Sequence, residues 1–567
     1  MFPTKRCLFI AVLLLIAGLG LAVNLDQISW AAPDQSPLYQ TVPPRPTSTP
    51  QDSDPGDNDD DDDSEPSWEK PIPPPPARIH PAGTPIPTGP PMPTDTPTPV
   101  AMPTSASFPN CRFGVAVVNN PVGTYDTTGL NIGWYVNFTT SSPAEPEGME
   151  FLRMVRVHQD KRDWCRDCYT RPYTYTMTPD ADTLLERVIA SPGDTWIIGN
   201  EPDRRDWETG GRDEMVPELY AQAYYEISQI IRGADPTAKI AVGGVMQATP
   251  LRLKYLDRIW EHYRTLCGRR LGDDVDIWNI HGFILREEQD SWGAEIPAGL
   301  TDTQGILYEV EDNANLDHFK EQISRFRTWM REKGERNKPL YVTGYGVIMS
   351  SYHIPVDRVR AFMSGTFDYM LDVTDVELGY PADDNRLVQR FLWYSLDDSS
   401  DNPARVEDYG GALFSSETLS RLEPGHDMAA YIRDPLHVEA NTRRVNLVVA
   451  NLQADFPAEI KPTEPVTLTL RATIQNRGNT RTHSGDGIRI RFWDGRPGNP
   501  QSEVVGTQII RDVYGCGYEV VVEQSLAIDP ESAGEHSWFV DVETLSEEKS
   551  TRDNIGKTRL AGPGERQ

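Results

Sequence analysis

The chain has 567 residues, which is too long for one compact core, because folded domains typically hold about 100 to 200 residues. Its 54 Lys and Arg residues face 85 Asp and Glu residues, so the formal net charge is −31 and the sequence pI is about 4.7. This charge argues against nucleic acid as a partner, because phosphate binding needs clustered Lys and Arg. We therefore expect two or three folded units joined by linkers.

Residues 1–32 have the composition of an export segment. Lys5 and Arg6 precede an unbroken apolar run over residues 7–23, as in a secretory signal peptide or an uncleaved signal anchor. The run is borderline against the roughly 17 to 25 apolar residues that span a bilayer, so both alternatives stay open. In either case we expect a secreted or cell-surface protein that contacts the membrane only through this segment.

Residues 33–107 are dominated by Pro, Thr, Ser and Asp and contain few branched apolar side chains. Such a segment cannot bury enough surface to offset backbone entropy, so the composition predicts a disordered, semi-rigid linker. Its acidic run at residues 57–63 lacks the glycine and the distal glutamate of a calcium-binding loop. A solvated spacer is therefore favoured over a calcium site.

Between residues 108 and 433, short β-type runs alternate with helical patterns such as 217–232 and 316–335. This alternation predicts a parallel sheet built from βα units. Eight such runs match a (β/α)8 TIM barrel. A doubly wound α/β sheet is the alternative, although no Gly-rich phosphate loop follows the first strand. The expected strands are 112–118, 133–138, 152–157, 195–199, 239–245, 277–281, 340–343 and 391–395.

After residue 433 the pattern changes to strands alone, and residues 440–562 carry seven short runs separated by turn signals such as Asp494-Gly495. This pattern predicts an all-β, immunoglobulin-like sandwich. The segments IQNRGNT, RIRFWDG and ETLSEEKSTRDN resemble bacterial cell-adhesion-related CARDB modules. That resemblance implies architecture more than activity. The expected strands are 446–452, 466–474, 488–493, 504–510, 520–526, 536–542 and 555–560.

The strongest signal for chemistry is WIIGNEP, a strand that ends in Asn200, Glu201 and Pro202. In a barrel, the carboxyl ends of the strands face the active-site mouth. A carboxyl at Glu201 could protonate a glycosidic oxygen if apolar walls raise its pKa toward neutrality. Asn200 could hydrogen-bond a neighbouring sugar hydroxyl. The alternative is that the motif only begins a loop or caps a helix.

Four segments in chain order, WIIGNEP, IWNIHGF, KPLYVTGYGV and FLWYSLDD, resemble strands four, six, seven and eight of clan A glycoside hydrolases. The resemblance implies hydrolysis of an O-glycosidic bond in an oligo- or polysaccharide, with Glu201 as acid/base and no cofactor. It also implies a second glutamate, the nucleophile, at the end of strand seven. Gly344 stands at that position, so the expected nucleophile is missing.

Glycine offers no nucleophile, and loss of such a group commonly slows catalysis by roughly 10⁴ to 10⁶. One explanation is a natural pseudoenzyme that binds glycan, and another is a sequence change in an active hydrolase. A third is that another carboxylate activates water from about 6.5 to 9.5 Å, as in inverting enzymes. A structural surface protein without sugar affinity is a further alternative. The candidate carboxylates for inversion are Asp397, Asp398, Glu287 and Glu288.

Supporting site residues are expected at the ends of neighbouring strands. His281 would hydrogen-bond substrate or the acid/base, unless it is a structural residue. Trp393 offers an indole face for sugar stacking, although barrel core packing would also explain it. Tyr345 would lean toward the missing carboxylate, and Arg156 would hold a carboxylate or sugar hydroxyl, or else form an outward ion pair. The loop tryptophans at the same face are Trp207 and Trp292.

Cys165 and Cys168 form a CxxC pair. A redox pair, half of a metal site and a small structural disulfide would each explain it. The disulfide is favoured, because export leads to an oxidising compartment and no second CxxC lies nearby. The ten histidines are scattered without metal-ligand spacing, so no metal site is expected. Cys111, Cys267 and Cys516 cannot be paired from the sequence.

Overall fold

The structure is a computed structural model that describes residues 109–559 except 144, 164, 207–210, 349–353, 399–410, 456–465, 483–486, 512, 529–535, 545–547 and 549. The predicted export segment and linker lie outside these ranges. Within them, no helix combines the length and the apolar character needed to cross a membrane.

The first part of the described chain holds a curled parallel sheet. One set of strands has the order β3-β2-β1-β10-β9-β8, and the other has the order β5-β4-β6-β7. Only Leu152 separates β3 from β4. Parallel bridges from Ala241 to Ile277 and from Val245 to Ile280 link the β7 and β8 segments. The strands are β1 (Phe113–Ala116), β2 (Trp134–Val136), β3 (Glu150–Phe151), β4 (Arg153–Gln159), β5 (Tyr175–Thr178), β6 (Thr195–Ile198), β7 (Lys239–Val242), β8 (Trp278–Ile280), β9 (Leu340–Tyr345) and β10 (Arg390–Trp393).

These pairings confirm the eight predicted strands and give a barrel-like α/β domain. The strands form because buried, β-branched and aromatic side chains pack well on a pleated sheet. β1, β6 and β10 are buried at every residue. β3 lies directly before the predicted strand at 152–157, and β5 is a further strand that the sequence does not predict. It pairs antiparallel with β4 and carries the half-exposed sequence YTMT, whose apolar content is too low to be noticed.

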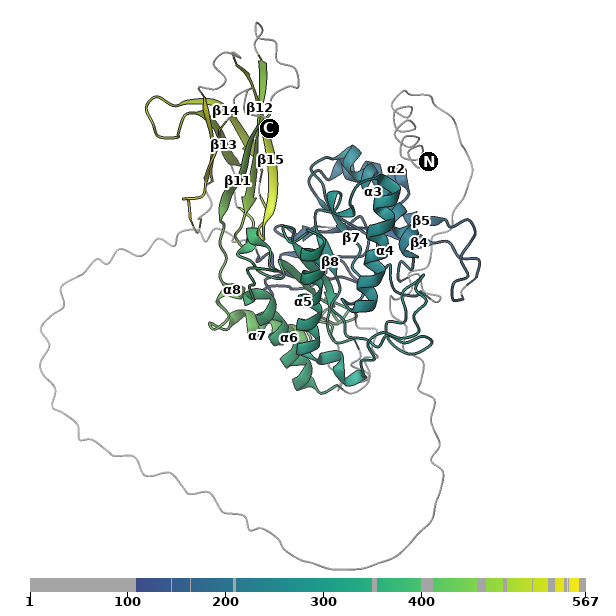
Figure 1. Ribbon diagram of the computed structural model, residues 1–567. Helices are drawn as coiled ribbons and strands as arrows, with labels where there is room; N and C mark the ends of the chain where they lie inside the picture. Colours follow the sequence, from purple (N-terminus) through teal and green to yellow (C-terminus); the bar gives the residue numbers. More distant parts are fainter. Residues whose placement is uncertain are drawn as a thin grey trace, which may run out of the picture. The chain divides into compact units, whose positions relative to one another are not determined.

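Helices pack against the strands, since Trp260 of α4 contacts Trp278 of β8 and Phe319 of α5 contacts Tyr345 of β9. Figure 1 shows α3 to α6 in front of the strands. The helix predicted at 217–232 is confirmed as α3, which begins with proline in its first turn and buries Leu219, Ala223 and Ile227. Helix α4 begins after Thr249, whose side chain accepts a hydrogen bond from a first-turn amide, and ends at Gly268 with φ 73°. The helices are α2 (Ala181–Ala190), α3 (Pro217–Ala234), α4 (Pro250–Cys267), α5 (Leu316–Glu332), α6 (Val356–Asp372), α7 (Glu423–Arg433) and α8 (Val438–Asn441), with 3-10 turns η1 (Val122–Thr124), η2 (Leu271–Asp273), η3 (Val310–Ala314) and η5 (Pro381–Asp383).

The C-terminal part consists of two antiparallel sheets with orders β11-β12-β15 and β14-β13-β16-β17. All seven predicted strands are confirmed. Alternate residues of β12 and β13 are buried, so one face of each sheet supplies a common core that includes Leu470, Ile490 and Val540. The strands are β11 (Leu447–Asp455), β12 (Val466–Asn476), β13 (Ile488–Asp494), β14 (Glu503–Ile510), β15 (Tyr518–Ile528), β16 (Ser537–Glu543) and β17 (Ile555–Arg559).

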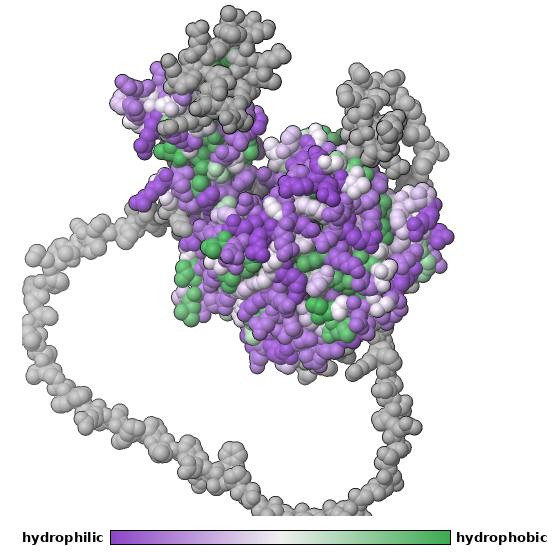
Figure 2. All heavy atoms as spheres, in the orientation of Figure 1, coloured by the Kyte–Doolittle hydropathy of each residue, from purple (hydrophilic) through white to green (hydrophobic). Residues whose placement is uncertain are grey.

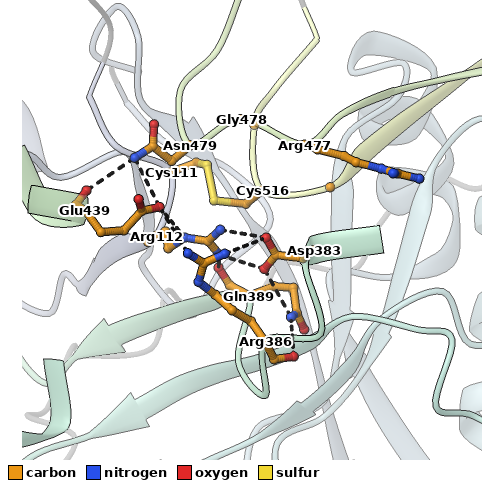
Figure 3. Close-up of polar contacts among 12 residues, drawn as sticks. Cys111, Arg112, Asp383, Arg386, Gln389, Glu439, Arg477, Gly478, Asn479 and Cys516 are labelled. Atoms are coloured by element: carbon orange, nitrogen blue, oxygen red, sulfur yellow. Dashed lines mark hydrogen bonds and ion pairs between the residues drawn. A yellow bond between two sulfur atoms is a disulfide. The ribbon is translucent and has the colours of Figure 1, made fainter. Parts of the chain in front are cut away.

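A disulfide joins the C-terminal sheets to the barrel-like domain, and the side chain of Asn479 also donates to a carboxylate oxygen of Glu439 in α8 at 3.4 Å. Cys111, two residues before β1, is bonded to Cys516, which lies just before β15. The neighbouring Arg112 pairs with Asp383 at 2.7 Å and with Glu439 at 3.5 Å, and Figure 3 shows this cluster beside the disulfide. Because these residues lie next to the amino end of β1, the joint is on the opposite side from the carboxyl ends of the strands.

Hydrophilic residues predominate on the face of the molecule that Figure 2 shows. On the face shown in Figure 2, the apolar residues lie in small, separate patches among hydrophilic ones. This agrees with the acidic, polar composition of the chain.

Candidate functional site

Glu201 lies just beyond the carboxyl end of β6. The chain leaves this strand through Gly199 at φ 87° and Glu201 at φ 49°. A glutamate seldom adopts a positive φ, and backbone strain of this kind concentrates at functional sites. The amide of Glu201 donates to the carbonyl oxygen of Gly244 at 3.1 Å, beyond the end of β7. The ends of two adjacent strands therefore fix the backbone of Glu201.

The carboxyl of Glu201 is fully buried and faces three cationic or polar partners. Its Oε1 lies 3.0 Å from Nδ1 of His281, and its Oε2 lies 3.3 Å from Nη1 of Arg204 and 4.0 Å from Nε of Arg212. Burial by itself raises the pKa of Glu201, but the hydrogen bond with His281 and the positive charges outweigh it and lower the pKa to about 2. The sequence predicts a proton donor only if apolar walls raise this pKa. The surroundings found here keep the carboxyl ionised at neutral pH.

The imidazole of His281 lies between two glycines. A methyl group on Gly344 would be 3.1 Å from Cγ and Nδ1 of this ring, and a methyl group on Gly244 would be 2.7 Å from its Cδ2. The structure thus brings Glu201, His281 and Gly344 together, as the motifs predict. The space beside Gly344 is not an open hollow, however, because the ring of His281 occupies it.

Arg156 supports the loop that carries the motif. Its Nη2 pairs with Oδ1 of Asp213 at 2.6 Å, and Oδ2 of Asp213 accepts hydrogen bonds from the amides of Asn200 at 2.8 Å and Val157 at 3.1 Å. The sequence predicts that Arg156 holds a carboxylate or a sugar hydroxyl, or else forms an outward ion pair. In the structure it binds a carboxylate of the protein, that of Asp213. The side chain of Asn200 donates weakly to Gly211 at 3.4 Å, while its Oδ1 is buried without a hydrogen-bond partner among the described residues. That oxygen can accept from a hydroxyl of a bound molecule.

Tyr345 and Trp393, predicted beside the sugar, lie between the strands and the helices. The ring of Tyr345 is 5.2 Å from that of Phe319 on α5 and 5.5 Å from that of Trp393, whose ring in turn is 6.4 Å from that of Phe367 on α6. Side chains alternate along a strand, so when Gly344 faces His281, the next residue faces the helices. The structure therefore gives both aromatic residues packing contacts in the core.

The four carboxylates considered for inversion are already bonded within the protein. Asp397 accepts from backbone amides of the loop after β1 at 2.7, 2.8 and 3.0 Å. Glu287 is fully buried and pairs with Arg252 at 2.6 Å. Asp398 bonds a tyrosine hydroxyl, and Glu288 pairs with the nearby Arg286 at 2.6 Å. Each of these groups has a structural partner, which does not favour a role in activating water.

Further buried charges surround the site that the sequence motifs do not identify. Asp203 pairs with Arg252 at 2.7 Å, and both side chains are fully buried. Glu214 pairs with Lys161 at 2.6 Å and with Arg205 at 3.0 Å. The signal that could have revealed them is the run of acidic residues and arginines directly after the Asn-Glu-Pro motif.

Cys165 and Cys168 are joined by a disulfide within the CxxC loop, defined as residues 161–169. Ion pairs attach this loop to its surroundings. Arg166 contacts a glutamate of the loop after β8 at 2.5 Å, and Asp167 contacts an arginine of the loop after β6 at 2.8 Å. The CxxC loop is therefore pinned to two loops that follow barrel strands.

The two loop tryptophans predicted at the site gain no support from the structure. Trp207 lies outside the described residues, and Trp292 is half-buried in the loop after β8. Among the side chains that the structure describes, no group of three or more His, Cys, Asp or Glu is arranged to hold a metal ion.

The chain matches no protein-family model and no curated protein sequence. Its fold is similar to that of a glycoside hydrolase family 128 endo-β-1,3-glucanase from Amycolatopsis mediterranei, solved with laminaritriose, with TM-score 0.35 and 14% identity over 57% of this chain and 99% of that one. A family 128 exo-β-1,3-glucanase from Blastomyces gilchristii gives TM-score 0.33 and 14% identity over 56% and 97%. A glucosidase from Croceicoccus marinus gives TM-score 0.34 and 12% identity over 75% and 95%.

Proposed function

We propose that this chain is an exported carbohydrate-binding protein, built on a glycoside-hydrolase-type (β/α)8 barrel that does not form a covalent glycosyl intermediate. In this proposal residues 108–433 form a closed barrel, and residues 440–562 form an immunoglobulin-like sandwich of CARDB type. The ligand is an extracellular oligo- or polysaccharide bound at the carboxyl ends of the barrel strands.

The strand pairings support a closed barrel. If β3 and β4 are counted as one strand interrupted at Leu152, eight parallel strands follow one another from β1 to β10, and β10 pairs again with β1. The two antiparallel sheets with a shared core support a sandwich. The disulfides Cys111–Cys516 and Cys165–Cys168 support export, because such bonds persist in oxidising compartments.

The observation that carries the proposal is the position of the His281 ring. It lies against Gly344, where the resemblance to clan A places the nucleophile, and its Nδ1 is 3.0 Å from Glu201. Retaining hydrolysis needs two carboxyl groups roughly 5 to 5.5 Å apart, one of which bonds to the sugar. Here an imidazole stands in the place of the second carboxyl.

The ionisation of Glu201 supports the same conclusion. A pKa of about 2 leaves only roughly 10⁻⁵ of the carboxyl protonated at pH 7. A general acid works best when its pKa lies near the working pH. The low pKa therefore disfavours proton donation to a leaving group, with or without a nucleophile.

An active hydrolase that has lost one side chain is the second candidate. The observation that favours it is that Asn200, Glu201 and His281 stay together at the strand ends and that Asn200 Oδ1 has no partner within the described part of the chain. The two candidates differ in one respect: the second predicts that restoring a carboxylate at Gly344 restores turnover.

The test is hydrolysis of a panel of aryl glycosides by the natural chain, by the same chain with azide or formate, and by Gly344→Glu. Because the His281 ring occupies the space that the new side chain needs, Gly344→Glu combined with His281→Ala is assayed as well. We expect no turnover from the natural chain and specific binding on a glycan array. Turnover by the natural chain, or an array without any binding, would reject the proposal. Turnover only after restoration would favour the second candidate.

A further inference from the structure

A polar hollow lies beside the Glu201 cluster, between the β4–β5 hairpin and the loop after β6. Its volume is about 420 Å³, within the range of about 300 to 1,000 Å³ typical of small-molecule sites. The ten described residues that line it all carry polar side chains. Arg212 connects the hollow with the site, because it lines the hollow and its Nε is 4.0 Å from Oε2 of Glu201.

Gln159 on β4 marks the hollow as a binding site. It lines the hollow, is only 4% exposed, and its Oε1 accepts a hydrogen bond from the amide of Val216 at 2.8 Å. Its Nε2 is buried without an acceptor anywhere in the described structure. Buried donors are nearly always satisfied by protein, water or ligand. The contact with Val216 holds the side-chain amide of Gln159 in place at the wall of the hollow, and its hydrogens find no acceptor among the described residues.

The charges of the lining indicate what kind of molecule fits. Three cations face four carboxylates, and Lys161 and Glu214 neutralise each other at 2.6 Å. An anionic sugar would meet four carboxylates against three cations, and a cationic amino sugar would still face the three cations. A neutral sugar avoids both costs, because its hydroxyl groups can donate to the carboxylates and accept from Gln159 and the arginines.

The walls of the hollow are held in position before any ligand arrives. Lys161, Arg162 and Asp163 belong to both the lining and the CxxC loop. That loop is closed by its disulfide and pinned by the ion pairs of Arg166 and Asp167. A preorganised wall reduces the entropy that binding has to overcome.

We propose that this hollow is a subsite for a neutral, hydroxyl-rich sugar residue, whose oxygen accepts a hydrogen bond from Nε2 of Gln159. This inference rests on the proposed carbohydrate binding and deepens it. It places recognition on the β4–β5 side of the barrel, away from Tyr345 and Trp393.

The experiment measures binding of cellotriose, xylotriose, mannotriose, trigalacturonate and chitosan trimer to the full natural chain by calorimetry. Two variants test the hollow. Gln159→Met removes the free donor, and Thr176→Phe places a ring over the hollow from an exposed position on β5. The matched control is Gln322→Met, because Gln322 is also buried but has both the oxygen and the nitrogen of its amide paired, at 2.9 Å each.

We expect a neutral trisaccharide to bind best, and both hollow variants to weaken it about tenfold or more, while Gln322→Met leaves affinity unchanged. If Gln159→Met does not fold, the affinity of Thr176→Phe decides the test. Binding of a neutral sugar that neither variant weakens would overturn the subsite and leave the proposed function standing. Tighter binding of trigalacturonate or chitosan trimer would overturn the neutral class. Absence of binding to all five sugars would also overturn the subsite, whereas only a glycan array without any binding would reject the proposed function itself.

Discussion

The pH dependence of unfolding should reveal whether Glu201 is a proton donor or one half of an ion pair. Its pKa in the folded chain is about 2, against an ordinary value of 4.5. A carboxyl whose pKa is lower in the folded than in the unfolded state contributes stability that is fully present above pH 4.5. That contribution is lost as the pH falls toward 2. The gap between the two values corresponds to about 3 kcal/mol of the free energy of unfolding.

The assay is urea unfolding of the natural chain and of Glu201→Gln at a series of pH values from neutral to acid. Glutamine keeps the shape of the side chain and can still bond His281, but it carries no charge and does not titrate. We expect the natural chain to exceed the variant in stability at neutral pH, and this excess to shrink by up to about 3 kcal/mol as the medium becomes acid. Glu332→Gln, at the exposed end of α5, gives the baseline for removing one surface charge.

Two results would refute this reasoning. If the natural chain gained stability relative to Glu201→Gln on acidification, the pKa of Glu201 would be raised, as a general acid requires. If the difference were constant at every pH, the carboxyl would not be coupled to His281 and Arg204 at all. The first result would favour the second candidate, an active hydrolase.

Two further changes test packing and cross-linking. Gly344→Ala places a methyl group 3.1 Å from the His281 ring, and Gly244→Ala places one at 2.7 Å, so we expect thermal unfolding to show losses of about 1 to 3 kcal/mol, larger for Gly244→Ala. A Gly344→Ala variant as stable as the natural chain would contradict the position of the ring. Removing the Cys111–Cys516 disulfide by serine substitution should cost about 2 to 5 kcal/mol, measured by urea unfolding without reductant. Removal of the CxxC disulfide, which spans a sequence separation of only 3, is the control and should cost less.

The strands could be predicted because residues that are buried in a sheet are mostly apolar, and their spacing is visible in the sequence. A run such as Trp196-Ile197-Ile198 is buried on both faces of a parallel sheet, and it can hardly be mistaken for a loop. The same holds for the alternating residues of β12 in the C-terminal part. β5 could not be predicted, since its sequence YTMT is half-exposed and gains its place by pairing with β4.

The site was only partly predictable, because its geometry depends on which way each side chain faces. The motif correctly places Asn200 and Glu201 at a strand end. The end of β9 shows why the rest could not be predicted. Side chains alternate along a strand, so a shift of one residue decides whether Gly344 or Tyr345 faces the site. The sequence predicts His281 as a candidate partner of Glu201, but the other two partners are arginines of the following loop, and no motif predicts that Arg204 folds back onto Glu201.

Under the proposed function, glycine at 344 accounts both for the absence of a nucleophile and for the low pKa of Glu201. When two carboxylates share a site, their repulsion raises the pKa of one of them, and this is how a glutamate becomes a proton donor at neutral pH. Glycine at 344 removes that repulsion, so the contacts with His281 and Arg204 act on Glu201 unopposed. Gly344→Glu should therefore raise the pKa of Glu201 even if it restores no turnover. Urea unfolding would show this as a smaller loss of stability on acidification than in the natural chain, whereas an unchanged loss would mean that the new carboxylate does not reach the site.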